Sequence, residues 1–188
     1  MLAPHLDAAV AVYGLPALGL DSARAGLVER CAARMAESIR ATQPQGPYRL
    51  AGWSFGGLLA YEIAAQLIGQ QAVVECVVVL DAPTTLSGYL PPERIARPAA
   101  GEAATPLDYR ARSIEARVHL LVARERIDAV QTLSTWSDVV PSGLLQTVLV
   151  DGNHHSMIRP PHIESVARHI GSALGVSLAA PDFSPVTS

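Results

Sequence analysis

A chain of 188 residues is long enough for one domain with a sizeable hydrophobic core. With 49% hydrophobic and 16% charged residues, it is not expected to be intrinsically disordered. The formal net charge of −3 argues against a nucleic-acid-binding or membrane-binding surface, and the apolar runs are too short to span a bilayer. Residues 1–20 show no signal peptide, so the cytoplasm is the expected location. Cys31 and Cys76 predict neither a disulfide nor a metal site.

Predicted strands and helices alternate along the chain. Apolar residues at 27, 31, 35 and 39 recur every four positions and predict an amphipathic helix, which Ser22 can cap. Further helices are predicted at 58–69 and 162–174, and strands at 10–13, 48–53, 72–80, 117–123 and 144–150. This alternation predicts an α/β fold with a mostly parallel central sheet flanked by helices. In such sheets, sites lie at the carboxyl ends of the strands.

Residues 83–113 differ in character from the rest of the chain. They carry five prolines and few apolar residues at helical spacing, so we expect a loop or a loosely helical insert that buries little surface. The tail after Gly175 has two prolines and little apolar periodicity, and we expect it to be frayed.

The stretch "GWSFG" at 52–56 fits the pattern G-x-S-x-G. Between a strand and a helix this pattern predicts a nucleophile elbow, a sharp turn that holds the hydroxyl of Ser54 in the open. The flanking glycines would let strand and helix approach where a Cβ would clash. The N–H of Phe55 and the start of the helix would then face a developing oxyanion.

A serine needs a base that accepts its proton. His154 and His155 follow the strand at 144–150, in a loop that can reach the elbow, and the residues alone leave both open. Structural roles suit the remaining histidines, which are His5, His119, His162 and His169.

The imidazole in turn needs an acid that orients it. Asp81 closes the strand next to the elbow strand, and Asp128 after the strand at 117–123 is its rival. Asp108 and Asp151 are weaker candidates. With Asp81 or Asp128, the chain order Ser, Asp, His is that of the α/β-hydrolases.

Several of these stretches resemble one family. "QPQGPYRLAGWSFGGLLAYEIAAQL", "VYGLPALGLD", "VVVLDAP" and "VDGNHHSMIRPPHIESVA" are similar to the chain-terminating (type I) thioesterase domains of nonribosomal peptide and polyketide synthases. The resemblance implies a single α/β-hydrolase domain over residues 1–175, with a lid insert at about 83–115 and a tail at 176–188.

The resemblance also implies the roles of the candidate residues. Asp81 stands 27 residues after Ser54, which is the family's usual spacing and favours Asp81 over Asp128. The "GNHHSM" stretch aligns with the family's histidine loop, so His154 is the implied base and His155 takes an aromatic position. The expected catalytic residues are therefore Ser54, Asp81 and His154, with Phe55 as oxyanion donor.

The function implied by the resemblance is release of an acyl or peptidyl chain through an acyl-serine, by hydrolysis or macrocyclisation. The substrate would be carried on the 4'-phosphopantetheine of a carrier domain, with no bound cofactor or metal. Two departures stand out: the family's first strand with its His-Pro-x-Gly-Gly-type loop is not found, and the lid is short. We therefore expect a shortened member whose open sheet edge favours self-association. The alternatives are a weakly active or non-catalytic domain that docks a carrier, and a small-molecule carboxylesterase.

Overall fold

The computed structural model describes the chain except for residues 1–2, 7–10, 16–25, 90–108 and 176–188. Its strands are β1 (Tyr48–Trp53), β2 (Val74–Leu80), β3 (Arg117–Ala123) and β4 (Leu145–Val150). Its α-helices are α1 (Leu27–Thr42), α2 (Phe55–Gly69), α4 (Ala129–Val139) and α5 (Ile163–Ala173). Two short 3-10 helices are η1 (Ala3–His5) and η2 (Leu86–Tyr89). Within the described residues, no helix is long and apolar enough to cross a membrane.

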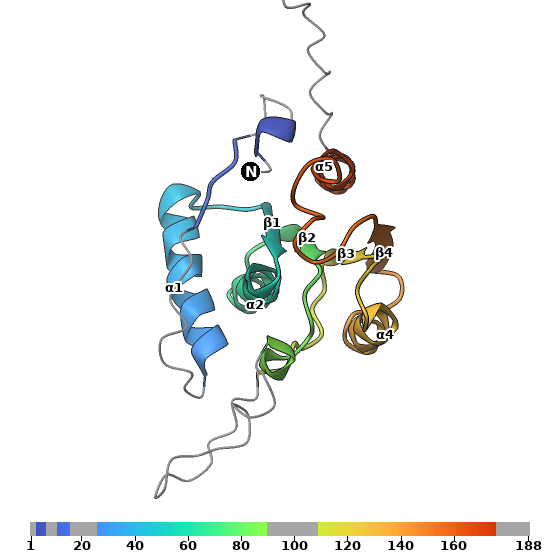
Figure 1. Ribbon diagram of the computed structural model, residues 1–188. Helices are drawn as coiled ribbons and strands as arrows, with labels where there is room; N and C mark the ends of the chain where they lie inside the picture. Colours follow the sequence, from blue (N-terminus) through green and yellow to red (C-terminus); the bar gives the residue numbers. More distant parts are fainter. Residues whose placement is uncertain (1–2, 7–10, 16–25, 90–108, 176–188) are drawn as a thin grey trace, which may run out of the picture.

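The four strands form one parallel sheet in the order β1-β2-β3-β4 (Figure 1). Helix α2 connects β1 to β2, and α4 connects β3 to β4, so each returns the chain to the same end of the sheet. This confirms the predicted α/β class with a parallel sheet. It also brings the carboxyl ends of all four strands to one edge, where the polar residues that follow them can meet.

The core consists of two apolar clusters, one on each face of the sheet. On one face, Val77 and Val79 of β2 pack with buried residues of α1, α2 and α4. On the other face, Val78 and Leu80 pack with α5 and with Leu6 beside η1. Figure 1 shows α2 and α4 on one side of the sheet and α5 on the other. Strand β2 is therefore buried on both faces, which explains why nearly all of its residues are apolar.

Two predictions for the N-terminal part need correction or fall outside the described residues. Ala11–Tyr13 form no strand, and Val12 and Tyr13 are exposed. Helix α1 is confirmed, but Gly26 at a φ of 70° is its N-cap residue, and the proposed cap Ser22 lies outside the described residues. The expected fraying of the tail at 176–188 also lies outside them.

Helix α4 was not predicted. Its Thr132, Trp136 and Val139 are buried at helical spacing, and the indole of Trp136 donates to the carbonyl oxygen of Ala82 at 2.7 Å. The surrounding Thr, Ser and Val residues have weak helix propensity, so packing of this apolar stripe on the sheet stabilises the helix.

The described ends of the segment 83–113 bury more than the sequence predicts. Leu86, Tyr109 and Ala111 are buried in the larger core cluster. The hydroxyl of Tyr109 donates to the buried carboxylate of Glu62 in α2 at 3.0 Å. The expectation that this segment buries little is therefore wrong for both of its ends, while 90–108 lie outside the described residues.

Candidate active site

Ser54 lies in a sharp turn between β1 and α2. Its φ of 56° and ψ of −131° fall in a region that side chains rarely adopt, which costs on the order of 1–3 kcal/mol. The turn is held from both sides, because the N–H of Ser54 donates to Leu80 of β2 at 2.8 Å and the N–H of Gly57 donates to Ser54 at 2.8 Å. A strained serine fixed between strand and helix is the geometry of the predicted elbow.

The glycines around Ser54 have unequal roles. A Cβ on Gly52 would lie 2.0 Å from the carbonyl oxygen of Gly56, so strand and helix approach there as expected. A Cβ on Gly57 would lie 2.9 Å from the carbonyl oxygen of Gly52. A Cβ on Gly56 would meet nothing within 4 Å, so the expectation that both motif glycines avoid a clash is wrong for Gly56.

His154 lies in the loop after β4, with its ring between Ser54 and Asp81. Its Nε2 is 2.9 Å from the Oγ of Ser54, and its Nδ1 is 2.6 Å from Oδ2 of Asp81. A hundred residues separate His154 from Ser54 in the chain, so the sheet topology alone brings them together. The side chain of His154 is part-exposed, which leaves the ring accessible from one side.

The loop that carries His154 is held by its own polar side chains. The Oδ1 of Asn153 accepts the N–H groups of His155 and Ser156, both at 3.0 Å, and the Oγ of Ser156 accepts the N–H of Asn153 at 2.8 Å. Gly152 has a φ of 92°, which a glycine adopts without strain. These bonds fix the backbone from which the imidazole projects.

Asp81 directly follows β2 and is fully buried. Its Oδ1 accepts the N–H of Ala123 at 3.0 Å, and its Oδ2 accepts from His154 and from the guanidinium of Arg126 at 3.1 Å. Both carboxylate oxygens therefore have partners, as a buried charge requires. Asp81 also has a positive φ of 51°, a backbone conformation that residues other than glycine rarely adopt.

None of the rival candidates that the structure describes is hydrogen-bonded to Ser54 or to Asp81. Asp128 is bonded to Arg126 at 2.6 Å, and Asp151 is exposed and paired with Arg124. His155 is exposed and packs edge-on against Trp53, with ring centroids 6.0 Å apart. The other histidines belong to η1, β3 and α5 or its N-cap: His5, His119, His169 and His162. Asp108 lies outside the described residues.

Sequence reasoning did not identify two residues that contact this group. The indole N–H of Trp53 donates to the carbonyl oxygen of His154 at 3.0 Å, and the two rings stack with centroids 4.8 Å apart. Arg126 reaches Asp81 from the end of β3. The place of Trp53 beside the serine was a usable signal, whereas nothing in the sequence connects Arg126 to a residue 45 positions earlier.

Phe55 is the first residue of α2, and its side chain packs partly buried against the larger core cluster. Its backbone lies in the first turn, where the helix dipole favours negative charge. Its role as oxyanion donor stays a prediction. Among the described residues, no cluster of three His, Cys, Asp or Glu side chains could hold a metal ion.

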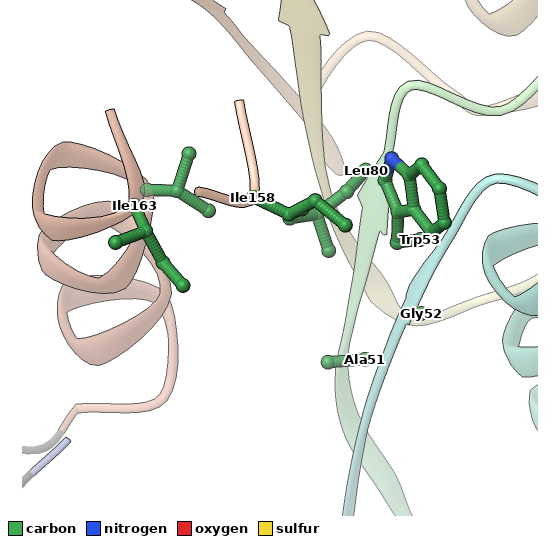
Figure 2. Close-up of a pocket in the computed structure, with 7 residues that line it drawn as sticks. Ala51, Gly52, Trp53, Leu80, Ile158 and Ile163 are labelled. Atoms are coloured by element: carbon green, nitrogen blue, oxygen red, sulfur yellow. The ribbon is translucent and has the colours of Figure 1, made fainter. Parts of the chain in front are cut away.

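An apolar hollow of about 280 Å³ lies between β1 and α5. Figure 2 shows Ala51, Gly52 and Trp53 along one side of it and Ile163 on the other. Leu80, Ile158 and Val166 complete its lining. Trp53 therefore lies between this hollow and the ring of His154.

Comparison with known proteins gives one family model, described as Thioesterase domain, which matches residues 1–98. The chain is 43% identical over 91 residues to the non-reducing polyketide synthase PFUR17_0229 of Pseudevernia furfuracea, which covers 47% of the chain and 4% of that protein. It is 42% identical over 73 residues to polyketide synthase PksR of Bacillus subtilis, covering 38% of the chain and 3% of that protein. The chain thus matches only a small part of these long relatives.

Solved structures show the same architecture over most of the chain. The NocB thioesterase domain in covalent complex with a fluorophosphonate nocardicin G analog superposes with a TM-score of 0.62 at 25% identity, covering 84% of this chain and 79% of that one. A second structure of the NocB thioesterase domain gives a TM-score of 0.61 at 28% identity, covering 83% and 77%. A four-domain nonribosomal peptide synthetase, covered over 17% of its length, gives 0.63 at 20% identity and shows the fold alone.

Proposed function

The chain belongs to the thioesterase domain family and has its α/β-hydrolase fold, and from this premise we propose that it releases acyl or peptidyl chains from a carrier-bound thioester. The observation that carries the proposal is the continuous contact from Ser54 through His154 to Asp81 at a strained elbow. The matching polyketide synthases support a carrier domain as partner. The substrate would then arrive on the phosphopantetheine arm of that carrier.

In the proposed reaction, the Oγ of Ser54 attacks the thioester carbonyl while Nε2 of His154 accepts the hydroxyl proton. The carboxylate of Asp81 accepts the Nδ1–H of His154, which fixes the tautomer with a free lone pair on Nε2 and stabilises the imidazolium that forms. The distances of 2.9 Å between Nε2 and Oγ and 2.6 Å between Nδ1 and Oδ2 allow the proton transfer to His154 and its hydrogen bond to Asp81 without rearrangement.

The tetrahedral anion forms next to the first turn of α2. The N–H of Phe55 and the helix dipole are the proposed stabilising groups, because both present positive partial charge to the new oxyanion. Collapse of this anion breaks the carbon–sulfur bond, and the departing thiol takes the proton from His154. Water, or a nucleophile within the acyl chain, then attacks the acyl-serine while His154 again accepts a proton; the bond to Oγ of Ser54 breaks, and Oγ takes the proton back from His154. Release is thus by hydrolysis or by cyclisation.

The test is intact-mass measurement after incubation with a fluorophosphonate and, separately, with acyl thioesters of N-acetylcysteamine. We expect one adduct on the wild-type chain and none on Ser54→Ala, which should remain folded because one hydroxyl contributes little to the core. His154→Ala should lose turnover, whereas His155→Ala should retain most of it. Asp81→Asn should lower turnover by about 10⁴ through the wrong tautomer, with the exposed Asp151→Asn as its matched control.

The outcomes separate the alternatives. Labelling that survives in Ser54→Ala, or equal losses in His154→Ala and His155→Ala, would contradict the assignment of these residues. No adduct on the folded wild-type chain would point to a domain that only docks a carrier. Equal turnover of a thioester and its matched oxygen ester would point to a carboxylesterase.

A further inference from the structure

Arg126 connects the acid of the proposed active site to a second carboxylate. Its Nη1 donates to Oδ2 and to the backbone carbonyl oxygen of Asp81, each at 3.1 Å. Its Nε and Nη2 donate to the two carboxylate oxygens of Asp128 at 2.6 Å and 3.1 Å. The guanidinium is thus shared between a fully buried carboxylate and an exposed one, and only 15% of its own side chain is exposed.

The contact with Asp81 falls on the oxygen that His154 uses. Oδ2 accepts from both His154 and Arg126, while Oδ1 accepts the N–H of Ala123. A fixed positive charge at this oxygen offsets part of the cost of burying the carboxylate and helps to orient it. The same positive charge repels a protonated His154. Arg126 therefore offsets part of the stabilisation that the carboxylate of Asp81 gives to the imidazolium form of His154.

Asp128 limits that opposing effect. Its carboxylate holds the guanidinium in a two-point contact, and its negative charge offsets part of the positive charge next to Asp81. The hydrogen bond from Arg126 lowers the pKa of Asp128, so Asp128 is ionised throughout the neutral range. Burial alone would lower the pKa of Arg126, but its bonds and proximity to Asp128 and Asp81 raise it, so the guanidinium stays charged.

We propose that Arg126 is a positioning residue that sets, through Asp81, the pH range in which His154 can accept the proton of Ser54, and that Asp128 tunes the effect of Arg126. This rests on the proposed function of His154 as base. The geometry requires the two residues to act with opposite sign. Removing the positive charge favours a protonated His154, whereas removing the negative charge of Asp128 disfavours it.

The remaining described neighbours of His154 include one other titratable side chain, His155, which is present in all of the variants compared. Among the described residues, the elbow contributes the uncharged Ser54 and Trp53, and the loop itself contributes His155. Asp151, which precedes the loop, is exposed and paired with Arg124, whose side chain is 59% exposed. Arg124 therefore provides a matched control, because it carries the same charge at the end of the same strand without a bond to Asp81.

The experiment follows the imidazole signals of the whole chain by NMR across a pH titration, with His154→Asn assigning the His154 signal. We expect the His154 midpoint to move upward by about 0.5–1 pH unit in Arg126→Gln, and downward by a smaller amount in Asp128→Asn. Arg124→Gln should leave it nearly unchanged. The acidic limb of kcat/KM should move in the same directions, because it reports groups of the free enzyme.

Movement of both variants in the same direction, no movement in either, or an equal movement in Arg124→Gln would overturn the proposal. Unfolding curves in urea check that each variant folds. Should Arg126→Gln not fold, Asp128→Asn alone decides, because its side chain is 55% exposed and its loss leaves the core intact. The titration needs no turnover, so a chain without esterase or thioesterase activity would contradict the proposed function and still test the charge pair.

Discussion

The unequal glycines of the elbow lead to a prediction about stability. Replacing Gly52 by alanine places a Cβ 2.0 Å from the carbonyl oxygen of Gly56, 2.3 Å from its carbonyl carbon and 2.7 Å from the nitrogen of Gly57. Ordinary contact begins near 3.4 Å, so the two Gly56 atoms would have to move by more than 1 Å and the nitrogen of Gly57 by about 0.7 Å. All three are backbone atoms in the first turn of α2, which is anchored by the bond from Gly57 to Ser54.

Overpacking by flexible side chains costs about 1–3 kcal/mol, and a clash with anchored backbone belongs at or above the top of that range. We therefore expect Gly52→Ala to lower the free energy of unfolding by about 3 kcal/mol or more, or roughly 6–12 °C in Tm. Gly56→Ala is the matched control. Its Cβ meets nothing within 4 Å, and alanine in a helix is favoured over glycine by up to about 1 kcal/mol.

The assay is urea unfolding of both variants beside the wild type, followed by circular dichroism at a fixed temperature. Wild-type stability of Gly52→Ala would refute the close approach of strand and helix at Gly52. A loss in Gly56→Ala as large as that in Gly52→Ala would refute the open space at Gly56.

Two further predictions concern contacts that support the site and the insert. Trp53→Phe keeps an aromatic face against His154 but removes the hydrogen bond from the indole to the carbonyl oxygen of His154, so kcat should fall about 3–10-fold with little change in KM. Trp53→Leu should lower kcat further. An unchanged kcat in both variants would contradict a positioning role for Trp53. Tyr109→Phe removes the hydroxyl that is bonded to buried Glu62 and should lower the free energy of unfolding by about 1–2 kcal/mol. Tyr13→Phe, which changes an exposed ring, should have no measurable effect. Equal unfolding curves for the two variants would contradict the role given to the Glu62 contact.

Much of the site could be predicted because its residues lie where strands end. The pattern around Ser54 needs a specific turn, and that turn is read from glycine spacing within five residues. Asp81 and His154 each follow an apolar strand, and parallel strands deliver their carboxyl ends to one edge. Local sequence patterns were therefore sufficient to place those candidate residues whose position depends on the sheet topology and not on one particular side-chain contact.

The remaining features depend on contacts between distant parts of the chain. Arg126 could not be assigned from sequence, because an arginine after a strand is ordinarily a solvated charge and only the packed structure turns it toward Asp81. Helix α4 is stabilised by burial of Trp136 under Ala82 and not by its own propensity. Residues 11–13 have strand-forming side chains, but a strand forms only with a neighbour, and no described strand pairs with them.

The position of β1 explains how the elbow is supported. Among the described strands β1 has a single neighbour, β2, so the ladder that holds Ser54 runs along one side only. On that side the bond from Ser54 to Leu80 joins the elbow to the strand that ends at Asp81, and Trp53 joins it to the loop of His154. Hydrogen bonds between neighbouring segments thus connect the backbone regions that carry the three proposed catalytic residues. Among the described strands, none pairs with the outer edge of β1, and an unpaired strand edge favours association with further chain, so the self-association expected from the sequence stays a prediction.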